Sequence, residues 1–325
     1  MFENLLSIAL QPAFMVFEPD SRFYWMFLLC AAGVALLACW RRLRESGGAS
    51  LVAAMREVFN PAVFFHRSAI ADYKFVFVTH FLAAIQIGAA TISAQVIAHG
   101  GAAALARAIG QPPSLVPGPA GIALMTLTSF LAMDFGNFYF HLLQHRSPML
   151  WELHKVHHSA EVLTPVTALR VHPLADILGK QFLAICVGLP TSLFLYVYGG
   201  LAEVQIAGVN LLLFLWQTVL VNNLAHSHVW VMFPRGIREI FYSPALHLIH
   251  HSANPRHYGK NLGFALTIWD RLADTHYQPT DRDRSELVLG LDSEDMRELK
   301  TTTQLFWTPM RNILFGAKKP STVRF

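Results

Sequence analysis

The sequence contains few charged residues. Asp, Glu, Lys and Arg make up only 14% of its 325 residues, whereas 54% are hydrophobic and the mean hydropathy is +0.39. Ordinary soluble domains carry about a quarter charged residues. A deficit of this size predicts a polytopic membrane protein.

Several other features are missing as well. The three cysteines, Cys30, Cys39 and Cys186, lie in apolar stretches, which argues against a disulfide framework and a cysteine-based zinc site. The start, MFENLLSIALQPAF, lacks a basic segment and a small-residue cleavage site, so we expect no cleaved signal peptide. No basic stripe with interleaved aromatics exists, which excludes nucleic acid as the expected partner. No flexible linker divides the chain, so we expect one structural unit.

Long apolar runs are plentiful instead. A helix crosses a bilayer with about 20 mostly apolar residues. Five stretches meet this requirement at about residues 22–40, 75–98, 120–140, 177–198 and 203–225. The turn Tyr198-Gly199-Gly200-Leu201 predicts that the last two form an antiparallel hairpin, and the Gly/Ala/Pro-rich segment after residue 98 predicts a loop with one short helix. The expected fold is an all-α membrane protein of about four to five spans, topped by a cytoplasmic helical cap.

The positive charges predict the orientation of these spans. If residues 41–74, 141–180 and the chain after 225 share one side, that side holds 23 of the 25 Lys and Arg residues. The positive-inside rule makes it cytoplasmic. Arg22, Arg107 and the amino terminus would then lie on the opposite side, in a multi-pass protein of a bacterial inner membrane or an ER-like membrane.

Histidines are concentrated in the second half, where 13 of the 16 follow residue 140. HLLQH contains His141 and His145, and HKVHH contains His154, His157 and His158. HLIHH contains His247, His250 and His251, and His226 closes the fifth stretch. Spacings of three and four place imidazoles on one face of a helix. We therefore expect these histidines to converge near the cytoplasmic ends of the spans.

Imidazole is a good ligand for iron, zinc and copper. Eight or more imidazoles at one depth exceed what a single metal ion uses, so the pattern favours two metal ions. One isolated HxxxH could arise by chance on a surface helix, but three clustered motifs on one predicted membrane face argue against this. The Glu-x-x-His motif of carboxylate-bridged di-iron bundles is absent.

The motifs resemble those of the fatty acid hydroxylase/sterol desaturase superfamily of membrane di-iron enzymes. The likeness covers about residues 125–276, in DFGNFYFHLLQHRSPMLWELHKVHHSAEVLTPVTALRVHPLAD and SPALHLIHHSANPRHYGKNLGFALTIWDRLADT. Residues 1–110 carry no matching motif. The resemblance implies an iron ligand set of His141, His145, His154, His157, His158, His226, His247, His250 and His251, with His172 of RVHP as a tenth ligand. His228 stands where Asn is commoner in the family, which leaves its role open.

Three further residues are candidates for supporting roles. Asp134 lies two helical turns before His141, and we expect its carboxylate to accept a hydrogen bond from a ligand imidazole. Arg170 and Asp270 could act similarly or form ion pairs at the surface, and the sequence leaves both alternatives open.

The resemblance implies three regions: an N-terminal membrane region of residues 1–119, a catalytic domain of residues 120–280 and a cytoplasmic tail of residues 281–325. It implies an oxidoreductase with two iron ions that uses O2 to hydroxylate or desaturate a membrane lipid. Electrons would come from a ferredoxin, a cytochrome b5-like protein or a reductase, because no flavin or nicotinamide fingerprint occurs. The sequence identifies neither the lipid nor the carbon that is oxidised.

Two alternatives belong to other functional classes. A zinc-dependent intramembrane hydrolase would need a general-base glutamate beside its ligands, and only Glu152 and Glu161 lie near the motifs. A haem or metal transport protein would place histidines in mid-membrane, whereas these lie at the predicted span ends.

Overall fold

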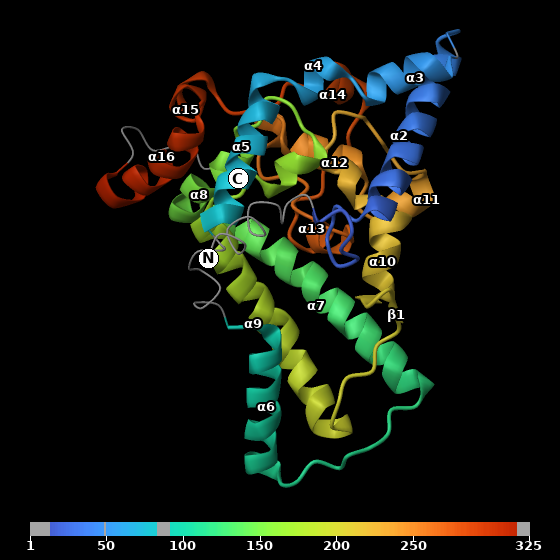
Figure 1. Ribbon diagram of the computed structural model, residues 1–325, viewed down its shortest axis with the longest axis vertical. Coiled ribbons are helices and arrows are strands. Elements are labelled where there is room, and N and C mark those ends of the chain that lie inside the picture. The colour runs from blue at the N-terminus through green and yellow to red at the C-terminus, as the bar shows by residue number, and fades with distance from the viewer. Residues whose placement is uncertain (1–13, 49, 83–91, 317–325) are drawn as a thin grey trace.

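The computed structural model describes residues 14–48, 50–82 and 92–316. These residues are mostly helical, with one two-stranded antiparallel sheet (Figure 1). The α-helices are α2 (Trp25–Glu45), α3 (Leu51–Val58), α4 (Pro61–Phe64), α5 (Arg67–Leu82), α6 (Ala94–Ile109), α7 (Pro119–Arg146), α8 (Pro148–His158), α9 (Pro173–Tyr198), α10 (Leu211–Thr218), α11 (Arg235–Arg238), α12 (Pro244–His250), α13 (Ile268–Leu272), α14 (Asp281–Ser285), α15 (Ser293–Glu298) and α16 (Thr302–Phe315). The strands are β1 (Gln205–Ile206) and β2 (Val209–Asn210), and the 3-10 helices are η3 (Pro165–Leu169), η4 (Asn222–Leu224) and η5 (Pro255–His257).

Three of these helices, α2, α7 and α9, are long and apolar enough to cross a membrane. Helices α7 and α9 pack against each other, and α6 packs along α9 (Figure 1). Large apolar side chains on their outer faces are about half exposed, including Leu124 of α7 and Leu189 and Leu193 of α9. Contiguous exposed apolar surface of this kind suits contact with lipid.

Proline and N-cap residues set the ends of the helices that carry the histidines. Pro148 cannot continue the hydrogen bonding of α7, which ends at Arg146, and it occupies the first turn of α8. The Ser147 side chain accepts a hydrogen bond from the Leu150 amide and caps α8. Pro173 begins α9 in the same way. These breaks fold α8 back at the end of α7.

Two of the expected elements lie near the middle of the sequence. The core of the expected second span lies in residues 83–91, outside the described residues, and the flanking helices α5 and α6 are not among the three span candidates. The segment expected as a loop with one short helix has that form, because a non-helical stretch follows Ile109, the last residue of the 16-residue helix α6. Ser93 caps its start by accepting a hydrogen bond from the Val96 amide.

The expected fifth span, residues 203–225, is not one helix. It contains the β1–β2 hairpin, the eight-residue helix α10 and η4. Ala207 and Gly208 have φ values of 52° and 79°, which are incompatible with a right-handed helix. Helix α10 packs against α2 and α7, so the expected hairpin with α9 is also wrong.

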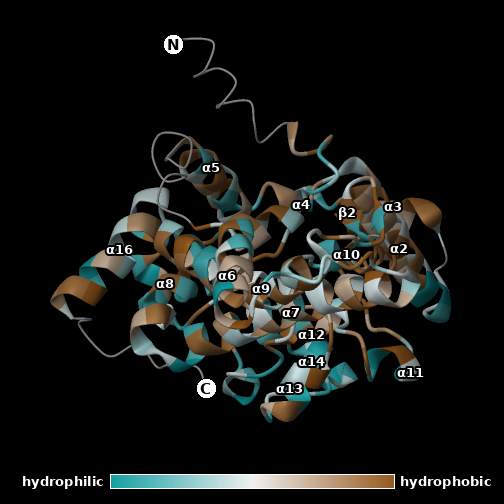
Figure 2. Cartoon of the chain, turned by 90° about the horizontal axis from the view of Figure 1, so that it is seen from below, coloured by the Kyte–Doolittle hydropathy of each residue, from teal (hydrophilic) through white to brown (hydrophobic). Residues whose placement is uncertain are grey.

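Helix α2 extends from the level of the histidine motifs toward α3, whereas α7 and α9 extend in the opposite direction toward α6 (Figure 1). Its small buried residues, Ala31, Ala35 and Cys39, pack against the chain around Val221 and Val229. Hydrophobic residues prevail on α2 and hydrophilic residues on α14 (Figure 2).

The segment after residue 280, which the sequence predicts to be a tail, is folded in its described part. Leu299 and Leu305 are buried in one cluster with Trp151 of α8. The Lys155 ammonium also donates a 3.0 Å hydrogen bond to Asp295. Residues 281–316 therefore form part of the cover over α8.

Candidate metal centre

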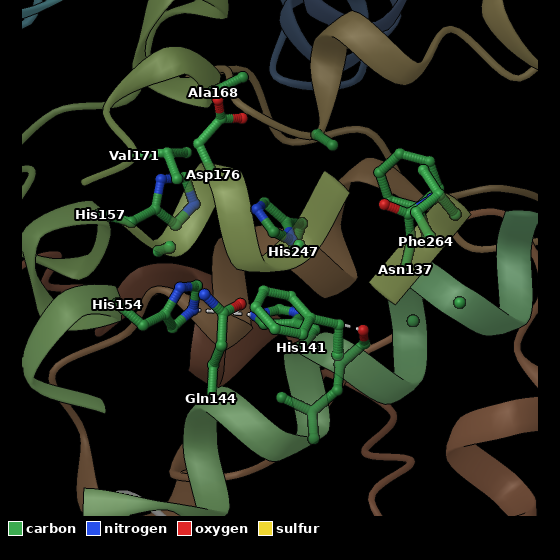
Figure 3. Close-up of a pocket in the computed structure, with 18 of the residues that line it drawn as sticks. Asn137, His141, Gln144, His154, His157, Ala168, Val171, Asp176, His247 and Phe264 are labelled. Carbon is green, nitrogen blue, oxygen red and sulfur yellow. Dashed lines mark hydrogen bonds between the residues drawn. The ribbon is translucent and has the colours of Figure 1, made fainter. Parts of the chain in front are cut away.

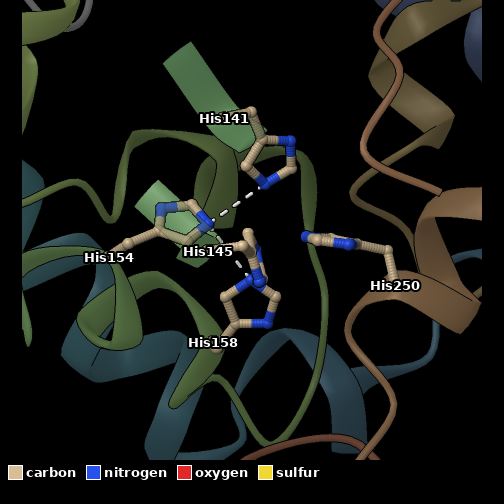
Figure 4. A group of neighbouring side chains, drawn as sticks. All are labelled: His141, His145, His154, His158 and His250. Atoms are coloured by element: carbon tan, nitrogen blue, oxygen red, sulfur yellow. Dashed lines mark hydrogen bonds between the residues drawn. The ribbon is translucent and has the colours of Figure 1, made fainter. Parts of the chain in front are cut away.

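The histidines of α7, α8, α12 and the segment after η4 converge in the protein interior. Their ring nitrogens form two groups, and within each group the candidate ligand atoms all lie within 4.8 Å of one another. Cluster 1 contains His141, His145, His154, His158 and His250 (Figure 4). Cluster 2 contains His157, His226, His247 and His251. The structure thus brings together nine of the ten predicted ligands.

Helices α8 and α12 each contribute to both clusters. In HKVHH, the pair four residues apart, His154 and His158, belongs to cluster 1 and His157 to cluster 2. In HLIHH, His247 and His251 belong to cluster 2, while His250 reaches cluster 1. The shared helices place the two clusters side by side, and the His157 and His158 ring centroids are 5.7 Å apart.

The nitrogen atoms of these imidazoles approach closely. In cluster 2, the Nε2 atom of His226 lies 3.0 Å from that of His157 and 2.9 Å from that of His247. In cluster 1, the Nε2 atom of His154 lies 3.1 Å from those of both His141 and His158. Each Nε2 atom carries either one proton or one lone pair, so ordinary two-centre hydrogen bonds cannot satisfy both contacts of His154 or of His226.

A metal ion in each cluster would account for this convergence of lone pairs. Metal–imidazole bonds of about 2.0–2.1 Å, as measured for zinc, put ligand nitrogens at right angles about 3 Å apart. The observed separations match this value. The donor set is rich in imidazole and contains no thiolate, which fits borderline metals such as iron, zinc or copper.

The protein environment keeps these imidazoles neutral, the form that binds metal. Burial and the neighbouring histidines hold the pKa values of His154 and His158 well below their usual range. Burial, followed by the charges of His141, Arg170 and Arg22, lowers the pKa of His157 to about 3. Charge on these buried rings would be costly without a counter-ion.

Backbone carbonyl groups orient two rings of cluster 1. The Nδ1–H of His141 donates to the Leu262 carbonyl at 2.9 Å, and the Nδ1–H of His250 donates to the Lys260 carbonyl at 3.0 Å. Both contacts direct an Nε2 lone pair toward the cluster, and the buried His250 Nε2 has no hydrogen-bond partner among the described residues. Hydrogen bonds of this kind fix the tautomer of a metal-binding histidine.

Asp270 fixes the segment around Leu262, whose carbonyl group orients His141. Its carboxylate accepts 2.8 Å hydrogen bonds from the amides of Leu262 and Gly263, and one from the Thr275 hydroxyl at 2.6 Å. Burial raises the pKa of Asp270, although these hydrogen bonds oppose the change. Asp270 is therefore buried in the interior, in contact with the segment that supports His141, and is not part of a surface ion pair.

Asp134 accepts no hydrogen bond from a histidine, contrary to expectation. Its fully buried carboxylate accepts hydrogen bonds from the Ala265 amide at 2.7 Å, the Leu266 amide at 3.2 Å and the Trp269 indole at 2.8 Å. Asp134 thus connects α7 to residues 265–269, which directly follow the segment bound by Asp270. It contacts the histidines only indirectly, through this backbone.

Arg170 is buried as well, and it joins the end of α8 to α5. The guanidinium donates to the Val156 carbonyl at 2.9 Å, the Ser159 hydroxyl at 2.6 Å and the Asp72 carboxylate at 2.7 Å. The Thr167 hydroxyl donates to the second Asp72 oxygen. This buried network fixes the backbone on both sides of His157 and His158.

His172 and His228 lie outside both clusters. His172 caps α9, because its Nδ1 accepts from the Leu174 amide and its Nε2–H donates to the Phe306 carbonyl at 3.1 Å. Both of its ring nitrogens are therefore engaged with backbone. His228 donates from Nε2 to the Glu57 carbonyl at 2.9 Å, which identifies the contact that the sequence left open.

A cavity of about 270 Å³ adjoins both clusters. His141, His154, His157 and His247 surround one space (Figure 3). The wall is completed by residues of α7 and α9, by the η4 region and by the segment near Leu262. Gln144 also lines the cavity beside His141 and His154, although the sequence analysis did not single it out; its only signal was its place inside HLLQH (Figure 3).

Arg22 lies in this wall too. Its carbonyl accepts a 2.7 Å hydrogen bond from the Asn223 amide group, and both Arg22 and His226 line the cavity. The prediction that Arg22 lies on the opposite side from the histidines is therefore wrong. Hydropathy alone cannot show in which direction α2 runs from the centre.

The fold and the site define a class of helical protein, with long apolar helices and a polyhistidine centre beside a cavity. The profile of the fatty acid hydroxylase family matches residues 126–275, which include all nine clustered histidines. Residues 126–275, a little under half of the chain, therefore carry a fatty acid hydroxylase domain. The match confirms the family resemblance that the histidine motifs indicate.

Several known proteins are similar to this segment. Alkylglycerol monooxygenase of Xenopus tropicalis is 32% identical over 151 residues, which are 45% of this chain and 29% of that protein. Ornithine lipid hydroxylase OlsE of Rhizobium tropici is 29% identical over 161 residues, which are 49% of this chain and 43% of that protein. Protein CER1-like 1 of Arabidopsis thaliana is 26% identical over 168 residues, which are 49% of this chain and 25% of that protein.

These matches span less than half the length of each relative. The names of two relatives, a monooxygenase and a hydroxylase, agree with the expected enzyme class, oxidoreductase. No solved structure is significantly similar to the chain.

Proposed function

We propose that this protein is an O2-dependent di-iron oxidoreductase that hydroxylates or desaturates a membrane lipid. The observation that carries the proposal is the division of nine buried histidines into two adjacent clusters beside one cavity. The family match and the lipid-related names of two relatives support it.

We assign each cluster to one iron ion. In cluster 1 the ligands are His141, His145, His154, His158 and His250, and in cluster 2 they are His157, His226, His247 and His251. His172 is left out of this set because backbone groups engage both of its ring nitrogens. Asp270 and Asp134 act as positioning residues for the segment that orients His141.

When bound, the two irons supply the redox chemistry by which O2 oxidises an unactivated C–H bond. The protein contributes neutral imidazoles, fixed by the hydrogen bonds of His141 and His250 to backbone carbonyls. It also contributes a cavity in which Phe140, Leu183 and Phe264 offer apolar surface to a hydrocarbon chain. Such a wall limits the access of water to the reacting carbon.

The membrane helices suggest how the substrate arrives. Helices α7 and α9 expose apolar side chains and lead directly to the cavity, so a lipid can enter from the bilayer. We place the histidine end of α7 at the cytoplasmic face, because the short basic segments gather on that side. Electrons then come from a separate donor, such as a ferredoxin, a cytochrome b5-like protein or a reductase. Residues 120–280 form the catalytic domain in this proposal.

The contacts of two glutamates disfavour a zinc hydrolase. Glu152 accepts hydrogen bonds from Lys155 at 2.9 Å and from Asn312 at 2.8 Å. Glu161 pairs with Arg67 at the surface. Neither carboxylate lines the cavity, whereas a general base must reach the reacting water.

Metal analysis and isotope incorporation test the proposed function. We expect detergent-purified protein to contain about two iron ions per chain, in line with one metal for each imidazole cluster. With heavy-isotope O2 and a chemical reductant, lipid extracts should gain one labelled oxygen atom or lose two hydrogens. One zinc ion per chain, or iron-dependent turnover without O2, would contradict the proposal.

A further inference from the structure

Arg22 provides a positive charge in the cavity that the proposed metal chemistry does not use. It shares the cavity wall with three cluster 2 residues, His157, His226 and His247. Within residues 14–48, 50–82 and 92–316, its guanidinium forms no ion pair, and its buried Nε has no hydrogen-bond partner. The guanidinium carbon lies 5.9 Å from the centroid of the Phe23 ring.

A charge withdrawn from water is ordinarily paired, since an unpaired one is costly. A guanidinium forms two parallel hydrogen bonds to a carboxylate or phosphate, which makes these groups its natural partners. The backbone of Arg22 is held in place, because its carbonyl accepts the 2.7 Å hydrogen bond from Asn223. The charge is therefore presented to the cavity by a fixed segment.

The other charged residues of the wall do not neutralise Arg22. Lys180 and Asp176 form an ion pair with each other at 2.6 Å, and the Lys180 side chain is exposed while that of Asp176 is about half exposed. The wall thus carries a net positive charge beside the metal centre and favours an anionic group.

A second cavity, of about 640 Å³, lies beside the first one along helices α7 and α9. On α7 it is lined by Met133, one helical turn before Asn137 of the first cavity. On α9 it is lined by Val187, one turn after Leu183 of the first cavity. Aliphatic side chains of α6 and α9 line part of it, among them Ala98, Val187 and Leu195, and this part suits a hydrocarbon chain. Polar residues, including Asp20 and Glu203, line the rest.

We propose that Arg22 binds the carboxylate or phosphate headgroup of an anionic lipid, while the hydrocarbon chain of that lipid follows α7 and α9 into the second cavity. This inference rests on the proposed function and names its substrate class. Because Arg22 and both histidine clusters share one small cavity, the oxidised carbon lies close to the headgroup.

Binding by detergent-purified full-length protein tests this inference without turnover. The probes are hexadecyl phosphate, hexadecanol and inorganic phosphate, measured by titration calorimetry. We expect the charged lipid to bind about tenfold more tightly than the alcohol, since a charge-assisted bidentate contact is worth at least that factor. Arg22→Gln should abolish this preference and leave the affinity for hexadecanol unchanged, whereas Arg22→Lys should restore part of it.

Arg107→Gln is the matched control, because Arg107 is an exposed arginine near the end of α6. It should behave as the wild type. An unchanged preference in Arg22→Gln would overturn the inference, as would inorganic phosphate that binds as tightly as hexadecyl phosphate. The iron content of the same samples is measured as well. A low iron content would contradict the proposed function, whereas the binding preference alone tests the role of Arg22.

Discussion

The Nε2 atoms of His226 and His247 lie 2.9 Å apart, although 21 positions separate them in the sequence. His226 follows η4, and His247 belongs to α12. No helical repeat produces such a contact, so it depends on how these two segments pack. His157 of α8 completes the arrangement at 3.0 Å from His226.

His226→Ala tests whether this contact marks a metal site. The substitution should remove a ligand of cluster 2 and lower the iron content from about two ions to about one, because each cluster holds its own ion. Metal analysis of the purified protein measures the change. His228→Ala is the matched control, since His228 bonds the Glu57 carbonyl outside both clusters. Equal iron losses in both variants would contradict the assignment of His226.

Asp270→Asn tests the support of His141. An asparagine side chain has only one acceptor oxygen, so the amide of Leu262 or that of Gly263 loses its hydrogen bond. The Leu262 carbonyl should then shift and orient the His141 ring less well. Altered support of a metal ligand typically lowers metal affinity or activity by about 10–100-fold. Iron retention against a graded series of chelator concentrations measures this effect. Asp270→Glu keeps the charge and should recover part of the affinity, and a wild-type retention curve for Asp270→Asn would remove Asp270 from this role.

Gly179→Leu tests the cavity. A Cβ atom at Gly179 would already lie 3.0 Å from the Phe140 ring, and both residues line the cavity. A leucine should therefore obstruct substrate binding and abolish most lipid oxidation, while the iron content stays unchanged. Gly33→Leu in α2 is the control, because no atom lies within 4 Å of a Cβ there. Full activity of Gly179→Leu would show that the substrate does not use this cavity.

Arg170→Met tests the buried ion pair beside α8. It leaves the Asp72 carboxylate without its 2.7 Å partner, and breaking a buried pair in this way costs about 3–5 kcal/mol. We expect a lower midpoint of thermal unfolding in detergent. The double variant Asp72→Leu/Arg170→Met removes both charges and should be more stable than Arg170→Met alone. The reverse order of stabilities would show that the charge of Asp72 is satisfied elsewhere.

The sequence was a good guide wherever local rules apply. Apolar stretches at 22–40, 120–140 and 177–198 predicted three long helices, and α2, α7 and α9 confirm them. The apolar stretch 203–225 was misleading, because length and hydropathy do not register a tight turn. Ala207 and Gly208 adopt positive φ values there, and the chain forms a hairpin followed by a short helix.

Polar residues were harder to interpret from spacing. Asp134 shares a helical face with His141, yet its carboxylate bonds the backbone near Ala265, 131 positions away. His172 precedes a proline at the start of α9, where its ring caps the helix. The partner of a polar side chain is decided by the nearest donor or acceptor in space, which sequence spacing does not give.

The sequence by itself determined that imidazoles would gather, because the period of 3.6 residues places positions three and four apart on one helical face. Only the tertiary structure decided their division into five and four, with His154 and His158 in one cluster and His157 in the other. It also decided that Arg22 would enter the same cavity. Both outcomes depend on how α8, α12 and the segment before α2 pack together, since packing places atoms that no local repeat relates.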